Sequence, residues 1–169
     1  MSRRIALVLF MGGLTLLASH RLAIGEDAVR AFVRNPDAYS RVTEKPYQMD
    51  NNVATLCRPP STPDSPHKDI GAYCHVFVNQ LAHQPLVEGS DAYPVGSLIV
   101  KQKLEAIDSK TASLYTAMRK RPAGYDPANG DWEYIVTDGV GKVLAQGCIE
   151  CHQAYRKTGF VTREYLSQK

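Results

Sequence analysis

The fold is predicted most clearly by residues 93–104, which read Tyr93-Pro-Val-Gly-Ser-Leu-Ile-Val-Lys-Gln-Lys-Leu104. A Pro/Gly turn opens this stretch, and the residues that follow are typical of a β-strand. Because side chains of a strand point alternately to its two faces, the stretch divides into two sets. One face carries Ser97, Ile99, Lys101 and Lys103, and the other carries Leu98, Val100, Gln102 and Leu104.

Three further strands are predicted on either side of this one. Residues 72–79 are rich in aromatic and β-branched side chains, and alternation puts Cys74 and His75 on opposite faces. Residues 111–120 alternate as well, and residues 132–137 follow a loop at 124–131 that is dense in turn formers. Strands at this spacing favour hairpins and therefore an antiparallel sheet.

A helix is expected at each end of the chain's folded part. Residues 26–39 have an amphipathic pattern that the Asn35-Pro36 pair ends, and the chain becomes helical again from Val143 to about Lys157. Residues 39–55 are expected to be irregular, residues 81–91 to form a connector, and residues 160–166 to form a strand or a short helix. The sequence therefore predicts an α+β fold with a mainly antiparallel sheet.

The first 25 residues have the pattern of a cleaved signal peptide. Arg3 and Arg4 precede a short apolar run, and small residues follow near Gly25. A permanent anchor is the weaker interpretation, because the apolar run is short for a bilayer. We therefore expect export to the periplasm, no stable membrane insertion after cleavage, and one domain at residues 26–169.

Removal of the signal peptide changes the charge balance. The segment carries three of the 20 Lys and Arg residues and none of the 17 acidic ones, so 17 residues of each sign remain. A mature chain close to neutral does not indicate a nucleic-acid partner.

The stretch Cys148-Ile-Glu-Cys-His152 is typical of a c-type haem attachment site. Two thiols one helical turn apart can each form a thioether to the haem, and the adjacent imidazole can bind the iron. A zinc half-site would need two further clustered ligands, and a thioredoxin-type pair normally lies early in a βαβ unit. We therefore predict one covalently bound haem c on the C-terminal helix, with Cys148 and Cys151 as attachment points and His152 as the iron ligand.

The other two cysteines, Cys57 and Cys74, are predicted to form a disulfide. An exported chain meets an oxidising compartment, where cysteines that haem does not use tend to pair. Closing the proline-rich segment between them could stabilise the fold by roughly 3 kcal/mol in the chain-entropy model. A reactive thiol pair is the alternative.

Four stretches, taken in order, resemble the cytochrome P460 family: Tyr93-Pro-Val-Gly-Ser-Leu-Ile-Val-Lys101, Thr116-Ala-Met-Arg-Lys-Arg121, Gly124-Tyr-Asp-Pro-Ala-Asn-Gly-Asp-Trp-Glu-Tyr134 and Gly147-Cys-Ile-Glu-Cys-His152. The resemblance covers roughly residues 40–166. It implies a mostly antiparallel β fold, often dimeric, with one high-spin haem c. His152 would bind one side of the iron, and the other side would be open or occupied by solvent.

The family has two functional branches. P460 proper oxidises hydroxylamine with a haem that is cross-linked to a lysine, and it passes electrons to an acceptor such as a cytochrome. The cytochrome c′-β group binds nitric oxide in an apolar pocket without the cross-link. Lys101 matches the cross-linking lysine, and Lys103 lies on the same strand face, so the resemblance leaves both open. Ordinary surface lysines are the alternative for both.

Two departures from the hydroxylamine-oxidising pattern bear on catalysis. The position of the distal carboxylate falls at Thr116, which cannot act as a general base near neutral pH. The distal arginine has no clear counterpart, since its position falls near Cys74. His75 is the candidate proton acceptor in their place. A third interpretation is an electron carrier, in which Met118, Met49 or His75 would be a second axial ligand.

Overall fold

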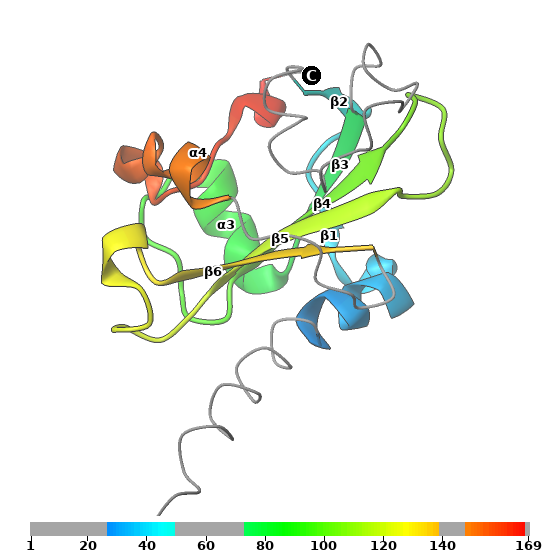
Figure 1. Ribbon diagram of the computed structural model, residues 1–169. Helices are drawn as coiled ribbons and strands as arrows, with labels where there is room; N and C mark the ends of the chain where they lie inside the picture. The colour runs from blue at the N-terminus through cyan, green and yellow to red at the C-terminus, as the bar shows by residue number, and fades with distance from the viewer. Residues whose placement is uncertain (1–26, 50–72, 139–147, 168–169) are drawn as a thin grey trace, which may run out of the picture.

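The computed structural model describes residues 27–49, 73–138 and 148–167 (Figure 1). The predicted signal peptide and Cys57 lie outside the described residues. Within the described ranges, no helix is long and apolar enough to cross a membrane.

Six strands of the described residues form one sheet in which every neighbouring pair is antiparallel. The order is β1-β3-β4-β5-β6, and β2 pairs with β3 beside β1. The strands are β1 (Ser40–Arg41), β2 (Tyr47–Gln48), β3 (Tyr73–Val78), β4 (Leu98–Leu104), β5 (Leu114–Lys120) and β6 (Trp132–Thr137). The predicted antiparallel sheet is thereby confirmed, and β3 to β6 follow one another as a meander.

The helical elements lie around this sheet. Residues 27–34 are α-helical and end at the Asn35-Pro36 pair, as predicted. The others are η1 (Pro36–Ala38), α3 (Gln80–Glu88), η2 (Pro127–Asn129), α4 (Ile149–Gln153), η3 (Arg156–Thr158) and η4 (Glu164–Leu166). The α+β class is confirmed.

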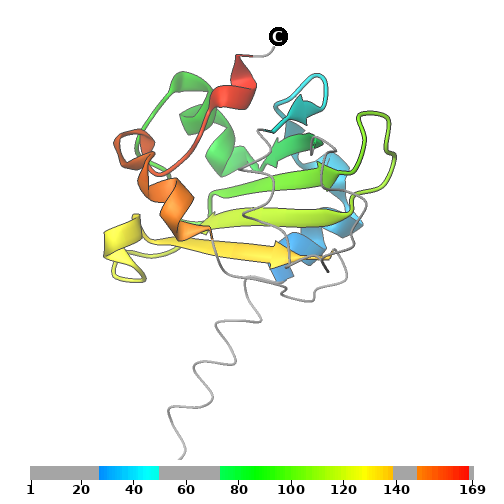
Figure 2. The ribbon, with the colours of Figure 1, turned by 45° about the horizontal axis from the view of Figure 1, so that its top comes forward.

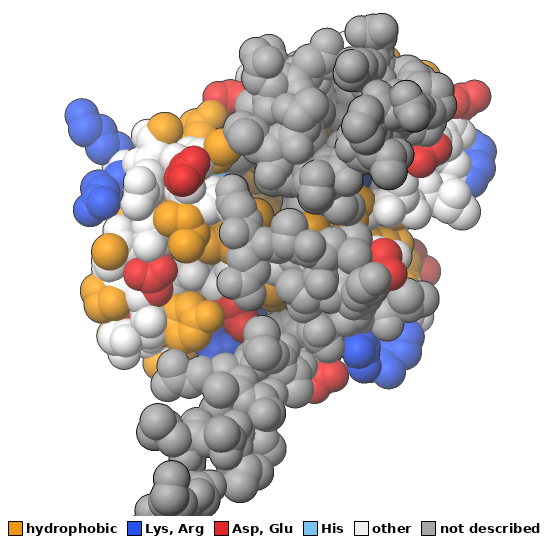
Figure 3. All heavy atoms as spheres, viewed as in Figure 1, with side chains coloured by type: hydrophobic (Ala, Val, Ile, Leu, Met, Phe, Trp, Pro, Cys, Tyr) orange, Lys and Arg blue, Asp and Glu red, His pale blue; other side chains and the backbone are white. Residues whose placement is uncertain are grey.

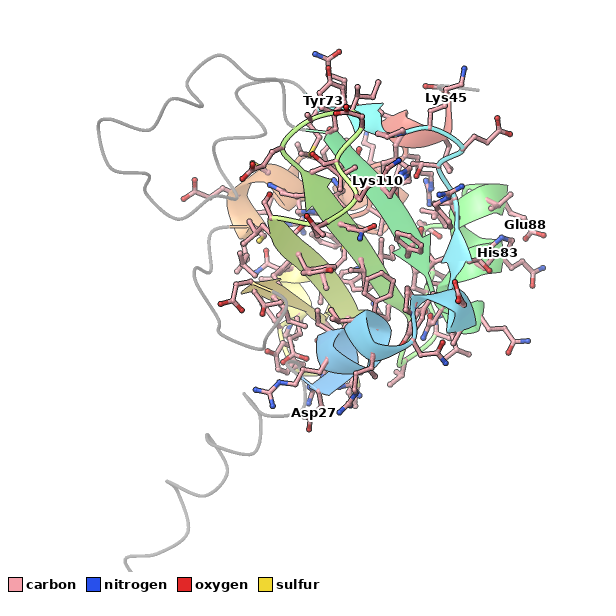
Figure 4. The ribbon with its side chains drawn as sticks, turned by 90° about the vertical axis from the view of Figure 1, so that its right-hand side faces the viewer. Asp27, Lys45, Tyr73, His83, Glu88 and Lys110 are labelled. Carbon is pink, nitrogen blue, oxygen red and sulfur yellow. The ribbon has the colours of Figure 1, made fainter. Side chains whose placement is uncertain are left out.

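The register of the strands defines two sheet faces. Val76, Lys101, Thr116 and Val136 lie directly opposite one another across β3 to β6, so they share one face, here called the pocket face. Helix 27–34 covers the opposite face and lies in front of the sheet in Figure 4. On that face, Val29 and Phe32 of the helix pack against buried residues of β4, β5 and β6. These strand residues are Leu98, Val100, Ala117 and Ile135.

The pocket face is covered by α3 and by the C-terminal segment 148–166, which lies over the sheet in Figure 2. Leu86 of α3, Val161 and Tyr165 pack here on apolar residues of the sheet. Fully burying one such aliphatic side chain stabilises the fold by roughly 1.5–3 kcal/mol. The sheet therefore has a helical layer on each side, and the C-terminal segment belongs to the layer over the pocket face.

The prediction of a connector at residues 81–91 is wrong, because α3 occupies Gln80–Glu88. The side chain of Asn79 accepts a hydrogen bond from the Ala82 N–H at the start of this helix. Gly89 ends it in a left-handed conformation. Proline inside a helix is unfavourable, yet the two capping residues and the burial of Leu86 outweigh the cost of Pro85.

The C-terminal helix is shorter than predicted. α4 is little more than one turn, η3 follows it, and the predicted start at residues 143–147 lies outside the described residues. The chain turns back at Gly159, whose φ of 68° is a left-handed value that glycine adopts easily. This reversal brings residues 160–166 onto the sheet, where η4 is the short helical alternative that the sequence left open.

Candidate functional site

The short helix α4 places Cys148 and His152 of the Cys-x-x-Cys-His stretch one turn apart. The N–H of His152 donates a hydrogen bond to the Cys148 carbonyl oxygen at 3.2 Å. Cys148 is buried, whereas Cys151 is half-buried. Contacts to the 124–131 loop hold this helix, because Gln153 Nε2 donates to Asn129 Oδ1 at 3.1 Å.

The ring of His152 is oriented by a backbone carbonyl. Its Nδ1 lies 2.7 Å from the Phe160 oxygen, which can only accept, so Nδ1 carries the proton and Nε2 keeps a lone pair. Metal-binding histidines usually have this second contact. Gly159 next to it accepts a hydrogen bond from Trp132 Nε1 at 2.9 Å, which fixes the turn to β6.

The imidazole of His152 is neutral at neutral pH. Its pKa is lowered to about 4, mainly by burial; the hydrogen bond to Phe160 acts in the opposite direction, and the charge of Lys101 adds to the lowering. A neutral imidazole is the form that binds metal ions.

A pocket lies between α4, the C-terminal segment and the pocket face of the sheet. It encloses about 530 Å³ of atom-free space, part of it open to solvent. Its lining is Met49, Ile99, Lys101, Lys103, Thr116, Ala117, Met118, Tyr134, Cys148, His152, Val161, Thr162 and Tyr165. On the outer surface near it, Figure 3 shows hydrophobic side chains over α4 and the 124–131 loop, where Ile149 and Tyr125 are exposed.

Apart from His152 and Cys148, the polar side chains of this pocket carry ammonium groups or hydroxyls. Lys101 and Lys103 come from β4, and the Nζ of Lys101 lies 5.7 Å from the ring centroid of Tyr165. The ring of Tyr134 lies 5.0 Å from that of His152. Both tyrosine hydroxyls are buried and have no hydrogen-bond partner within the described residues. No Asp or Glu is among the described residues that line the pocket.

The structure brings most predicted site residues together. Cys148, His152, Lys101 and Thr116 line one pocket, and Thr116 lies directly opposite Lys101 on the neighbouring strand. Cys151 belongs to the same helical turn but is not among the residues that line the pocket.

His75 does not join this group. It lies on the opposite sheet face with Phe77, and its Nδ1 is 3.2 Å from the Thr43 hydroxyl oxygen. Burial and the nearby charge of Arg41 lower the pKa of His75. The alternation along β3 therefore correctly predicted that Cys74 and His75 lie on opposite faces. His75 is separated from the pocket because it lies on the face that points away from it.

Cys74 lies on the pocket face and is fully buried. Burial raises the pKa of this thiol. Its predicted disulfide partner, Cys57, lies outside the described residues, so the disulfide stays a prediction.

Several lining residues were not predicted from sequence as parts of a site. Tyr165 and Val161 come from the C-terminal segment, and Tyr134 comes from β6. On β6, alternation was a usable signal, because Tyr134 pairs with Met118 and must share its face.

Among the described residues, no three His, Cys, Asp or Glu side chains form a group that could hold a metal ion. No protein-family model matches the chain, and no curated protein matches it either.

Proposed function

We propose that this chain is an exported mono-haem c protein of the cytochrome P460 type, which binds a small nitrogen ligand such as nitric oxide. The observation that carries this proposal is the placement of Cys148 and His152. They lie one helical turn apart and line the same pocket, and the Phe160 carbonyl holds the imidazole with the Nε2 lone pair available. Cys148 and Cys151 would hold the haem, and His152 would be the axial ligand.

The pocket residues fit a haem chemically. The macrocycle is largely apolar, as are Ile99, Met118 and Val161 of the lining. The buried hydroxyls of Tyr134 and Tyr165 lack partners within the described residues, and leaving such a group unsatisfied costs about 1–3 kcal/mol each. Carboxylates of a haem are acceptors that such donors can bind. A bound haem would supply an iron that can take a small ligand on the side away from His152.

Ligand binding is favoured over hydroxylamine oxidation by the proton chemistry of the lining. Oxidation of hydroxylamine releases protons, and a general base must lie within reach of them. The described lining residues include no carboxylate, Thr116 has no basic group, and His75 lies across the sheet. Lys101 and Lys103 both line the pocket, so either remains the candidate for a lysine–haem bond.

The test is a pair of titrations on the purified haem-containing protein. We expect nitric oxide to shift the haem absorbance bands with saturation, and hydroxylamine with an artificial electron acceptor to give no steady-state turnover. Sustained turnover would contradict the binding proposal and would support a hydroxylamine-oxidising enzyme instead. Such an enzyme would need an electron-acceptor cytochrome as its partner.

A second candidate, an electron carrier, is favoured by one observation. The thioethers of Met49 and Met118 belong to the pocket lining, and methionine is a common second axial ligand in electron-transfer cytochromes. A low-spin absorbance spectrum in both oxidation states would support this candidate, and a high-spin spectrum would reject it.

A further inference from the structure

The hydroxyl of Tyr165 is a buried donor without a partner. This residue is 3% exposed, and its ring packs edge-on against Tyr47 at 6.2 Å between centroids. Burial raises its pKa, so the phenol keeps its proton. Within the described residues nothing accepts a hydrogen bond from it. In native folds, such a buried donor often marks the place where a ligand, an ion or a water molecule binds.

Lys101 adds a positive charge beside the same ring. Its ammonium lies 5.7 Å from the centroid of Tyr165 and contacts no carboxylate of the described residues. A charge that is partly removed from water is stabilised by a counter-ion. The described lining residues supply none, because no Asp or Glu is among them.

The strand positions place Lys101 and the ring of His152 over different strands of the sheet. Lys101 lies on β4, whereas the His152 ring lies against Tyr134 of β6. Two inter-strand spacings, roughly 10 Å, therefore separate the strands that carry Lys101 and Tyr134. Ile99 and Met118 add apolar surface on β4 and β5 of the same pocket.

We propose that Lys101 and the Tyr165 hydroxyl form an oxyanion subsite in this pocket, which takes an O–N–O or O–C–O group. A cation and a neutral donor, with no acid beside them, are suited to such a group. The inference rests on the proposed function for its setting, but the subsite itself consists of residues of the chain. Two sources share this chemistry: a free anion of the size of nitrite, and a carboxylate of the bound haem.

The experiment is a calorimetric titration of sodium nitrite into the haem-containing protein and four variants. Tyr165→Phe removes only the hydroxyl, and Lys101→Met removes the charge. Lys101→Arg keeps the charge but removes the amine that a haem cross-link needs. Lys110→Met is the matched control, because this exposed lysine lies in the loop between β4 and β5 (Figure 4). The reduction potential and the nitric oxide affinity of each protein are measured beside it.

For a free anion we expect nitrite affinity to fall roughly tenfold or more in Tyr165→Phe and in Lys101→Met. Lys101→Arg should stay within about threefold of the parent in nitrite affinity, and Lys110→Met should match the parent in its affinity for both nitrite and nitric oxide. If the source is a haem carboxylate, nitrite binding will not distinguish the variants, but the reduction potential will shift in Tyr165→Phe and Lys101→Met.

The subsite is rejected if Tyr165→Phe and Lys101→Met bind nitrite as the parent does and keep its reduction potential. Failure of the haem proposal is recognised separately, because it appears as a missing haem absorbance in the parent protein. Calorimetry reports nitrite binding whether or not haem is attached.

Discussion

The Nδ1 atom of His152 lies 2.7 Å from the carbonyl oxygen of Phe160, a residue with a φ of 66°. That left-handed conformation is uncommon outside glycine, and here it follows Gly159 at 68°. The pair of left-handed residues presents two successive carbonyls, one to His152 and one to Trp132. The orientation of the imidazole therefore depends on a backbone turn seven to eight residues further along the chain.

Gly159→Ala should disturb this turn. A methyl group at residue 159 would overlap the carbonyl oxygen of Asp91, and φ is also unfavourable for alanine. We expect a loss of about 2–4 kcal/mol in the free energy of unfolding, measured by urea denaturation. Gly89→Ala is the control, because residue 89 has a similar φ but open space, and should lose about 1 kcal/mol. Equal losses in the two variants would contradict the role of the Asp91 contact.

The stability of the haem-free chain should depend on pH through His152. Its folded pKa of about 4 lies below its ordinary value of 6.5, so between these values the unfolded chain binds more protons. Stability should therefore fall as pH drops from about 6.5 to 4, by roughly 2 kcal/mol. The measurement is urea denaturation of a Cys148→Ser/Cys151→Ser variant at several pH values.

The control for this pH dependence adds His152→Gln to the same variant. His75, whose pKa is also lowered, contributes equally to both chains, so the difference between them isolates His152. Parallel pH profiles for the two chains would show that burial of His152 has no such effect.

Strands β3 to β6 could be predicted from sequence because their residues alternate and turn formers separate them. β1 and β2 were missed, because they lie in residues 39–55, which were expected to be irregular. The same alternation correctly separated Cys74 from His75 and placed Lys101 with Lys103. The helix α3 was missed because residues 81–91 were interpreted as a connector, although Asn79 and Gly89 are capping residues on either side of it. Capping residues and helix-breaking residues act together on whether a helix forms. Here the burial of Leu86 against the sheet stabilises the helix in spite of Pro85.

His75→Ala should leave the site unchanged. Because this side chain lies on the sheet face opposite the pocket, we expect nitric oxide affinity and haem absorbance bands equal to those of the parent protein. Loss of its hydrogen bond with Thr43 should cost about 1 kcal/mol in the free energy of unfolding. A change in ligand affinity without a change in haem content would restore His75 as a site residue.

Thr116→Glu should confer hydroxylamine oxidation on the haem-containing protein. Residue 116 lines the pocket directly opposite Lys101, whose charge favours an ionised carboxylate. A positioned general base contributes about 10²–10⁴-fold to a proton-transfer step, so the variant should turn over at a rate at least about tenfold above the detection limit, where the parent shows none. Steady-state assay with an artificial acceptor measures it. Thr116→Gln is the control, because glutamine has the size of glutamate but no charge. An equal gain in turnover in this variant would contradict the general-base explanation.

The membership of the pocket was predictable only in part. The Cys-x-x-Cys-His stretch has a distinctive spacing, and β4 has a regular alternation, so Cys148, His152 and Lys101 could be chosen from sequence. Tyr165 and Val161 could not, because they reach the sheet through the reversal at Gly159 and not through any periodic pattern. Met49 likewise comes from a segment that the sequence marked as irregular.

The central claim is that Cys148, Cys151 and His152 hold one haem c. Its most direct test is the mass of the protease-derived peptide that contains Cys148 to His152, taken from protein exported by a host that can attach haem c. We predict that this peptide carries the mass of one haem through two thioethers. A peptide of unmodified mass, with both thiols free to react with an alkylating reagent, would contradict the claim.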